Sequence, residues 1–333
     1  QFTLDTLAPD ELLLAMDDAT GELAMRVVDV CHQHQVQVAL WTMVCADRPC
    51  ALPALAPVQD SRGHSGYGKL GAWAGLGRGE ERFLFSCPSA VAQDNSGIEL
   101  ALETAHAIAA DGLFLDRIRY PSPANGLEFL SGCACARCRE RFHASTSELW
   151  PDLLSLALQH APQGAQGARH YVEETQHCWR FKSRQISAVV AGYANAARSQ
   201  GLRLGLDLFA PALAPWVGQD YGTLAAWADF IKPMLYCKAW GPAGLPLELA
   251  SLVRGLLGAG VQAAPALSFA ATLSGLTELG VQRCADGGVL AGDTARSELL
   301  KIDAQWAAHT HRPVVYAGLE FVNHPDYATH IDD

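Results

Sequence analysis

Short apolar stretches recur along the chain and alternate with longer stretches that have the 3.6-residue period of amphipathic helices. The clearest is Leu113–Arg117, whose residues alternate as those of a buried strand do, and a helical pattern over Gly97–Ala110 leads into it through Asp111 and Gly112. Eight strands are predicted in this way, at Phe2–Leu7, Val36–Val44, Arg82–Cys87, Leu113–Arg117, Leu202–Phe209, Phe230–Tyr236, Val261–Phe269 and Val314–Phe321.

Helical patterns occupy the spaces between these strands, and no linker divides the chain. The regular alternation predicts an α/β fold of the (β/α)₈ TIM-barrel type, formed as a single domain over residues 1–333. Residues 122–168 interrupt the alternation and are predicted to be an insert after the fourth strand. A doubly wound open sheet is the competing fold, but no glycine fingerprint follows the first strand. The predicted helices are Pro9–His34, Gly97–Ala110, Tyr171–Ser199, Thr223–Ala228, Leu247–Leu257 and Ala295–Ala308.

Three carboxylates fall where predicted strands end, at Asp116, Asp207 and Glu320. Successive residues of a strand point to opposite faces, so Asp207 shares the inward row of Arg203 and is predicted to point into the barrel. Active sites of TIM barrels lie at the carboxyl ends of the strands, which makes these three residues the catalytic candidates. Each also has a structural interpretation, since a buried acid needs a partner.

The structural interpretations name specific partners. Asp116 could pair with Arg117 or Arg119, and Asp207 could pair with Lys232 or Arg203. Glu320 could make a hydrogen bond at the barrel rim.

Four phrases of the sequence resemble a known group of proteins. They are Asp-Gly-Leu-Phe-Leu-Asp-Arg-Ile-Arg-Tyr-Pro at residues 111–121, Trp179-Arg180, Leu-Asp-Leu-Phe at residues 206–209, and Asp-Phe-Ile-Lys-Pro-Met-Leu-Tyr at residues 229–236. Together they resemble the glycoside-hydrolase-like TIM barrels that are related to the α-amylase and α-galactosidase barrels. The resemblance implies a carbohydrate cleft at the carboxyl face, with Asp116 in the position of the nucleophile. It also matches Asp207 to a fifth-strand Asp, and Tyr236 to an aromatic residue that closes the sixth strand.

Several aromatic and charged side chains fall at the same predicted face. An aromatic ring stacks on the apolar side of a sugar while nearby charged groups bind its hydroxyls. Asp220 either binds such hydroxyls or caps the helix that follows it. The candidates for substrate binding are Trp41, Arg119, Tyr120, Trp216, Asp220, Tyr236, Lys238 and Trp240.

Three cysteines lie within six residues, at Cys133, Cys135 and Cys138. Tetrahedral zinc takes four such ligands, so the cluster predicts a structural zinc site in the insert. His143, Cys178, His177 or another cysteine could supply the fourth ligand. A disulfide with one free thiol and three unligated thiols are the alternatives. No organic cofactor is expected.

Composition narrows the classes of partner. The net charge of −11 argues against nucleic-acid and anionic-membrane surfaces, which need clustered Lys and Arg. No run of 18 apolar residues and no signal-peptide pattern is present, which predicts a soluble protein. The ten cysteines favour reduced thiols and a cytoplasmic setting, and secretion stays open. The chain begins at Gln1 rather than Met, which is compatible with removal of an upstream segment.

The sequence therefore predicts a glycoside hydrolase that acts on an oligosaccharide or polysaccharide with paired carboxylates. A carbohydrate-binding barrel without catalysis is the alternative. A metal-dependent hydrolase is disfavoured, because the two His-x-His pairs, at His32 and His34 and at His309 and His311, precede strands and so fall at the opposite end of the barrel. The sequence does not define the oligomeric state.

Overall fold

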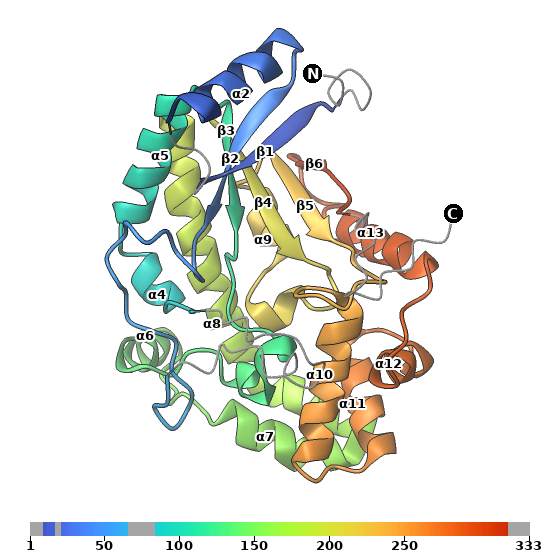
Figure 1. The fold of residues 1–333 in the computed structure, drawn as a ribbon. Helices are drawn as coiled ribbons and strands as arrows, with labels where there is room; N and C mark the ends of the chain where they lie inside the picture. The colour runs from blue at the N-terminus through green and yellow to red at the C-terminus, as the bar shows by residue number, and fades with distance from the viewer. Residues whose placement is uncertain (1–8, 17–20, 66–83, 319–333) are drawn as a thin grey trace.

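The structure, a computed structural model, describes residues 9–16, 21–65 and 84–318 of the 333-residue chain (Figure 1). Its centre is one sheet of six parallel strands that follow one another in sequence order. The strands are β1 (Glu11–Ala15), β2 (Gln37–Met43), β3 (Gly112–Asp116), β4 (Arg203–Phe209), β5 (Phe230–Met234) and β6 (Val314–Val315).

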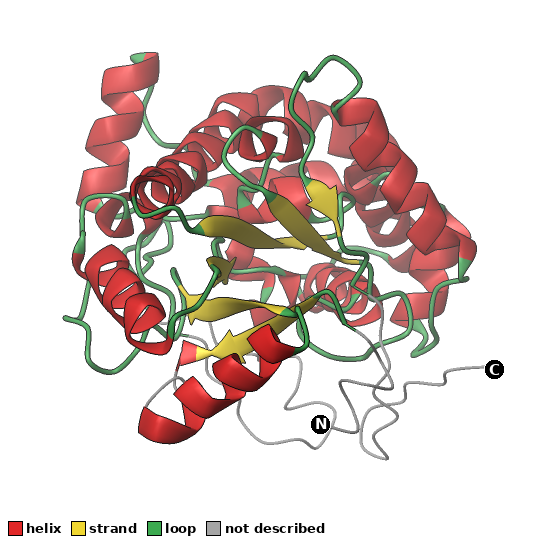
Figure 2. Ribbon diagram, turned by 90° about the horizontal axis from the view of Figure 1, so that it is seen from above, coloured by secondary structure: helices red, strands yellow, loops and turns green. Residues whose placement is uncertain are grey.

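The sheet curves into a half-barrel, and helices cover its outer side (Figure 2). This is an α/β fold of the TIM-like kind, and five of the eight strands that the sequence predicts lie in its sheet. The complete eight-stranded barrel stays a prediction. No helix in the described part of the chain is long and apolar enough to cross a membrane.

The helices differ greatly in length. The longest, α8, runs for 36 residues along the outside of the sheet, and α6, α7, α10, α11 and α12 gather beyond the carboxyl ends of the strands (Figure 1). The α-helices are α2 (Gly21–Gln33), α4 (Pro88–Val91), α5 (Ser96–Ile108), α6 (Ala136–Thr146), α7 (Leu153–His160), α8 (Gly164–Ser199), α9 (Tyr221–Ala225), α10 (Leu245–Gly258), α11 (Ala263–Ser274), α12 (Glu278–Ala285) and α13 (Asp293–Gln305).

The segment predicted to be an insert, residues 122–168, is built mostly of short helices. It contains α6, α7 and the 3₁₀ turns η2 (Pro123–Asn125), η3 (Leu127–Ser131) and η4 (Ala161–Gln163). It ends inside α8, which begins at Gly164 rather than near Tyr171 as predicted.

Four of the predicted strands are confirmed as β2, β3, β4 and β5. The predicted eighth strand is confirmed at Val314 and Val315, and Gly318 adds a parallel bridge to Met234. The predicted first strand, Phe2–Leu7, lies outside the described residues.

Three predictions of secondary structure are wrong. Val261–Phe269 is not a strand, because helix α11 begins at Ala263, where an alanine-rich stretch favours helix and Pro265 falls in the tolerated first turn. Residues 84–87 of the predicted third strand form isolated antiparallel bridges, from Phe85 to Ala46 and from Ser86 to Pro57. The helix predicted over Pro9–His34 contains β1, since a continuous run of leucines does not reveal its period.

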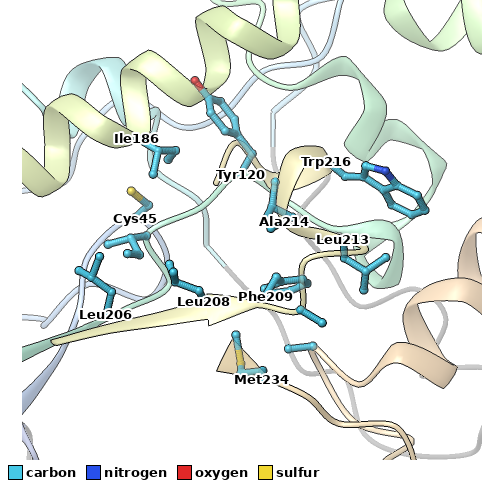
Figure 3. Packing of buried hydrophobic residues seen from close by; sticks show 14 of the residues in the cluster. Cys45, Tyr120, Ile186, Leu206, Leu208, Phe209, Leu213, Ala214, Trp216 and Met234 are labelled. Carbon is cyan, nitrogen blue, oxygen red and sulfur yellow. The ribbon is translucent and has the colours of Figure 1, made fainter. Parts of the chain in front are cut away.

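The two faces of β4 behave as its alternation predicts. Leu206 and Leu208 point to the outer side, where Ile186 of α8 packs near them (Figure 3). The inner side carries Gly205 and Asp207, and the ring of Phe230 from β5 lies against Gly205. A layer of apolar side chains therefore crosses the inside of the half-barrel, where Phe230 stacks on Phe114 with centroids 5.9 Å apart.

Gly205 tests this inner layer. An added Cβ would come within 2.1 Å of the Phe230 ring, so we expect Gly205→Ala to destabilise the fold by about 1–3 kcal/mol through overpacking. Gly258→Ala, at the exposed end of α10 with nothing within 4 Å of its new Cβ, is the matched control and should be neutral or slightly stabilising. Urea unfolding measures both, and equal midpoints would contradict the packing described for the half-barrel interior.

Candidate functional site

Asp116 is the last residue of β3, and its carboxylate is held in one orientation. The indole N–H of Trp41 donates to Oδ2 at 3.1 Å, and the backbone N–H of Arg117 donates to Oδ1 at 2.5 Å. Trp41 reaches it from the neighbouring strand β2. Each carboxylate oxygen therefore has a fixed N–H donor, while the residue remains half-buried.

The backbone turns sharply directly after this carboxylate. Arg117 adopts a left-handed conformation with φ +52°, which is unusual for a residue other than glycine. Its guanidinium forms an ion pair with Asp47, which is also left-handed at φ +45°. The turn aims the Arg117 N–H at Asp116, and local strain of this kind is common where a side chain must be held for function.

Asp207 lies beside Asp116 in the same inward row. Strands β3 and β4 pair with Leu115 opposite Leu206, so Asp116 and Asp207 occupy the next position of each strand. On its other side Asp207 faces Lys232 of β5, whose ammonium donates to both carboxylate oxygens at 2.9 Å. Lys232 also donates to the Tyr236 hydroxyl at 3.2 Å.

Burial dominates the electrostatics of Asp207, whose residue is only 4% exposed. Burial raises its pKa to about 7, the Lys232 ammonium opposes the rise, and the Asp116 carboxylate adds to it. Burial alone would lower the pKa of Lys232, but the Asp207 and Tyr236 groups outweigh it and raise the pKa. The two carboxyl groups therefore have different surroundings. N–H donors fix both oxygens of Asp116, whereas burial favours the protonated form of Asp207.

We call Trp41, Asp116, Asp207, Lys232 and Tyr236 the rim cluster. Four of its members are predicted from the sequence as catalytic or substrate-binding residues, and the structure brings them together at the carboxyl ends of neighbouring strands. Lys232 joins them as the partner of Asp207, one of the two partners that the inward row offers. The structure therefore contains the ion pair that the structural interpretation of Asp207 predicts.

Four of the predicted substrate-binding residues are buried, and three of them, Arg119, Tyr120 and Trp216, lie close together. Tyr120 is 0% exposed and Trp216 is 2% exposed, and both pack in the core around the end of β4 (Figure 3). The Arg119 guanidinium lies over the rings of Phe85 and Phe209, at 5.0 and 4.7 Å, and donates to the Tyr120 carbonyl. These residues support the rim from beneath rather than present a face to solvent.

The remaining predicted site residues lie in different places. Trp240 is buried to 7% exposure under the Arg254 guanidinium, and Lys238 is half-buried. Asp220 caps α9 by accepting from the Thr223 N–H at 2.6 Å, which is the structural alternative for this residue. Glu320 lies outside the described residues.

A cavity of about 280 Å³ lies inside the half-barrel next to the rim cluster. Lys232 is the residue common to both, and most of the remaining wall is apolar or aromatic. The other lining residues are Asp10, Glu11, Leu13, Phe114, Phe230 and Tyr316.

A second cluster consists of four buried cysteines, Cys87, Cys133, Cys135 and Cys138, whose sulfur atoms lie within 4.8 Å of one another. Three come from the predicted triplet, and the fourth, Cys87, precedes α4. All four are free thiols. Their mutual hydrogen bonds, above all those with Cys133, lower the pKa of Cys135 and raise that of Cys138, so the thiols do not titrate independently of one another. This arrangement of sulfur ligands can hold a metal ion.

The fourth member is another cysteine, an alternative that the sequence left open without naming Cys87. The other residues named for the role lie elsewhere, since His143 bonds the Glu148 carbonyl and His177 bonds the Glu148 carboxylate. Cys87 ends the predicted third strand and the triplet follows the predicted fourth, so their shared place at the carboxyl ends of neighbouring strands was the available signal.

Comparisons with known proteins give no family assignment. No family model matches the chain, and no curated protein does. The glycoside hydrolase domain of PgaB (BpsB) from Bordetella bronchiseptica aligns at 12% identity and TM-score 0.37, over 90% of this chain and 76% of that one. The glycoside hydrolase domain of PelA from Pseudomonas aeruginosa aligns at 14% identity and TM-score 0.32, over 75% and 71%.

A chitinase from Chromobacterium violaceum aligns at 10% identity and TM-score 0.33, over 77% of this chain and 59% of that one. The chain spans 54 to 59% of the length of three of the matched chains. Because these TM-scores lie below 0.5, the likeness carries no conclusion about activity.

Asp207 should give the fold a distinctive pH dependence. Its pKa is about 7 in the folded protein and near 3.9 in an unfolded chain, so the folded state binds the proton more tightly between these values. Its contribution to stability is therefore complete below about pH 4 and is lost as the pH rises through about 7, by at most roughly 4 kcal/mol. The difference in urea unfolding free energy between wild type and Asp207→Asn measures it.

Asp94→Asn is a control of opposite sign. Burial would raise the pKa of Asp94, but hydrogen bonds from Ser96 and Arg48 outweigh it and lower the pKa. Its contribution should be present above about pH 4 and be lost on acidification. If the Asp207→Asn difference grew rather than shrank between pH 4 and 7, the Lys232 ion pair and not burial would govern Asp207.

Proposed function

We propose that this protein is a glycoside hydrolase in which Asp116 and Asp207 are the paired carboxylates. The observation that carries the proposal is their placement, since the two acids occupy adjacent inward positions of neighbouring parallel strands at the carboxyl end of the sheet. Glycoside hydrolysis needs one carboxyl group that is protonated and one that is ionised. Burial raises the pKa of Asp207, while two N–H donors hold Asp116 as an acceptor.

The proposed reaction assigns a role to each group. Asp207 gives its proton to the glycosidic oxygen as the bond from that oxygen to the anomeric carbon breaks. Asp116 attacks the anomeric carbon with its carboxylate, and water later releases the sugar with Asp207 as the base that recovers the proton. Lys232, which donates to both oxygens of Asp207, holds this side chain in one position while it loses and regains its proton.

The strand register favours retention of configuration. Neighbouring strands lie about 4.8 Å apart, so side chains at adjacent register positions approach each other closely. Carboxyl groups about 5–5.5 Å apart are typical of retaining enzymes, and larger separations admit the water of an inverting one. Trp41 and Tyr236 are half-buried beside the acids and are the rings best placed to contact the sugar of an oligosaccharide or polysaccharide substrate.

A carbohydrate-binding barrel without turnover is the second candidate. The observation that favours it is the ion pair, because Lys232 contacts both oxygens of Asp207 and could hold that carboxylate ionised. In that case the rim cluster would bind hydroxyl groups and not cleave a bond.

Substitution of each acid should separate the two roles. On a panel of aryl glycosides and oligosaccharides, we expect Asp116→Asn to lower kcat by about 10³-fold or more on every cleaved substrate. Asp207→Asn should lower kcat/KM strongly on oligosaccharides but little on dinitrophenyl glycosides, because kcat/KM reports the first step and this leaving group needs no proton. Steady-state kinetics of purified variants measure both.

The control is Asp293→Asn, which removes an exposed carboxylate at the start of α13, and its kcat should equal that of wild type. Binding of oligosaccharides without any turnover, in wild type and in Asp116→Asn alike, would contradict the hydrolase and support the binding barrel.

We also infer that the four cysteines hold a structural zinc ion. Four buried sulfur atoms within 4.8 Å of one another match the ligand number and softness that zinc requires. Bound as thiolates, they would tie the chain near α4 to residues 133–138 and so fix the start of α6 against the rest of the fold.

Ser89 and Gln185 are the neighbours that would orient one of these ligands. The Ser89 hydroxyl lies 3.3 Å from the Cys138 sulfur and 2.8 Å from the Gln185 amide oxygen, and its residue is fully buried. A hydroxyl has one hydrogen, so Ser89 cannot donate to both. With a thiolate at Cys138, rotation of the Gln185 amide by half a turn would let its NH₂ donate to Ser89 and let Ser89 donate to the sulfur.

Metal content tests the inferred zinc site. Cys87→Ser should lose bound zinc, while Cys178→Ser should keep it, because Cys178 is buried outside the cluster. Ser89→Ala should keep the ion but weaken its affinity by about 10–100-fold, as loss of an outer-shell hydrogen bond does. Metal analysis and competition with a chromophoric chelator measure these outcomes.

Replacement by Co²⁺ supplies a second readout, since four thiolates give an intense charge-transfer absorption that three give more weakly. Equal zinc content in wild type and Cys87→Ser would show that Cys87 is not a ligand.

A further inference from the structure

A second pocket lies outside the half-barrel, where the segment that follows β4 packs along α8. It encloses about 400 Å³ between α8, residues 211–223 and Gln305 of α13, and we call it the outer pocket. Its lining residues are Trp179, Arg180, Ser183, Arg184, Pro211, Ala214, Pro215, Gly218, Gln219, Asp220, Tyr221, Thr223 and Gln305.

Fixed hydrogen bonds separate the outer pocket from the rim cluster. Gln219 is 2% exposed, accepts from the Phe209 N–H at 2.8 Å and donates to the Ile118 carbonyl at 3.3 Å. The Tyr221 hydroxyl donates to the Phe209 carbonyl at 2.7 Å. The wall between the two sites is therefore rigid, and a ligand in the outer pocket would not reach Asp116.

The charge of the outer pocket is opposite to that of most of the protein. Arg180 and Arg184 lie one helical turn apart on α8 and are both exposed. In the described part of the chain Arg180 has no ion pair or hydrogen bond, and Arg184 has one long bond, 3.4 Å, to the Ser145 hydroxyl. The one carboxylate in the wall, Asp220, already accepts from the Thr223 N–H. Two guanidinium groups thus present free donors in a chain whose net charge is −11.

The rest of the wall suits a sugar ring. Trp179 is fixed, because its indole N–H donates to Thr175 at 2.7 Å and the Lys182 ammonium lies 4.9 Å from its ring centre. Pro211 and Pro215 add apolar surface, and Ser183 and Gln305 add neutral polar groups at the edge. Aromatic and apolar walls with a few polar groups are what a sugar needs, and arginine pairs are what a carboxylate needs.

We propose that the outer pocket binds a carboxylate-bearing sugar of the hexuronate class, with Arg180 and Arg184 on its carboxylate and Trp179 in the wall against its ring. The site is independent of the rim cluster, and the inference holds whether or not Asp116 and Asp207 cleave a glycosidic bond. Its effect would be to give the protein affinity for acidic polysaccharide in spite of its negative net charge.

Calorimetric titration of the full chain tests the proposal. The Asp116→Asn variant serves as the parent so that turnover cannot disturb the measurement, and the probes are trigalacturonate, neutral maltotriose and inorganic phosphate. We expect binding of trigalacturonate that weakens as salt rises, at least about 10-fold weaker binding of maltotriose, and a further loss of about 10-fold or more in Arg180→Met/Arg184→Met.

Arg169→Met is the matched control, because Arg169 is exposed on the same helix but does not line the pocket, and it should bind as the parent does. Equal affinity for the neutral and acidic trisaccharides would overturn the proposal, as would unchanged binding in the double variant. If phosphate bound as tightly as trigalacturonate, the pocket would be a site for free anions and not for a sugar. Absence of any trigalacturonate binding would also overturn it.

Discussion

The parallel register of β3, β4 and β5 is the constraint on which the site depends. It places Asp116, Asp207 and Lys232 in one row across three neighbouring strands, all facing the inside of the half-barrel. A shift of one residue in any strand would turn its member of the row to the outer face, among the leucines that pack against α8. The chemistry of the rim is therefore fixed by the same hydrogen bonds that form the sheet.

The layer below the row shows why charged groups are tolerated there. Phe114 and Phe230 stack inside the half-barrel, and the Lys232 ammonium lies 5.8 Å from the Phe114 ring centre, so an apolar layer lies directly below the charged row. Burial in this surrounding raises the pKa of Asp207, and the Lys232 ammonium opposes the rise. The balance leaves the pKa at about 7. A buried carboxyl group with a pKa near neutral pH can both donate and accept a proton there, which suits general acid and base catalysis better than a fully solvated carboxylate does.

The sequence predicted this row better than it predicted the rest of the fold. Leu202–Phe209 alternates leucines with Arg203, Gly205 and Asp207 between Gly201 and Pro211, so its position and the inward direction of Asp207 could be inferred from local pattern. The stretch Val261–Phe269 failed because an apolar run rich in alanine fits both a strand and a buried helix, and the neighbouring α8 decides between them. The burial of Tyr120 and Trp216 could not be predicted, because residues beyond the ends of strands can turn into the core, which depends on loops that no period describes.

The cysteine cluster and the outer pocket were hard to predict from the sequence for one shared reason, which is that their residues meet only after folding. Cys87 joins Cys133, Cys135 and Cys138 only after the segment around residue 87 pairs with Ala46 and Pro57, and the triplet by itself leaves the fourth ligand undetermined. Arg180 and Arg184 likewise become a pocket wall only when the loop after β4 folds back along α8. In both cases a long helix brings the parts together: Gln185 of α8 contacts Ser89 beside the cysteines, while Arg184, one residue earlier, faces the outer pocket. Successive residues of a helix point about 100° apart, so Arg184 and Gln185 of α8 face the outer pocket and the cysteine cluster, respectively.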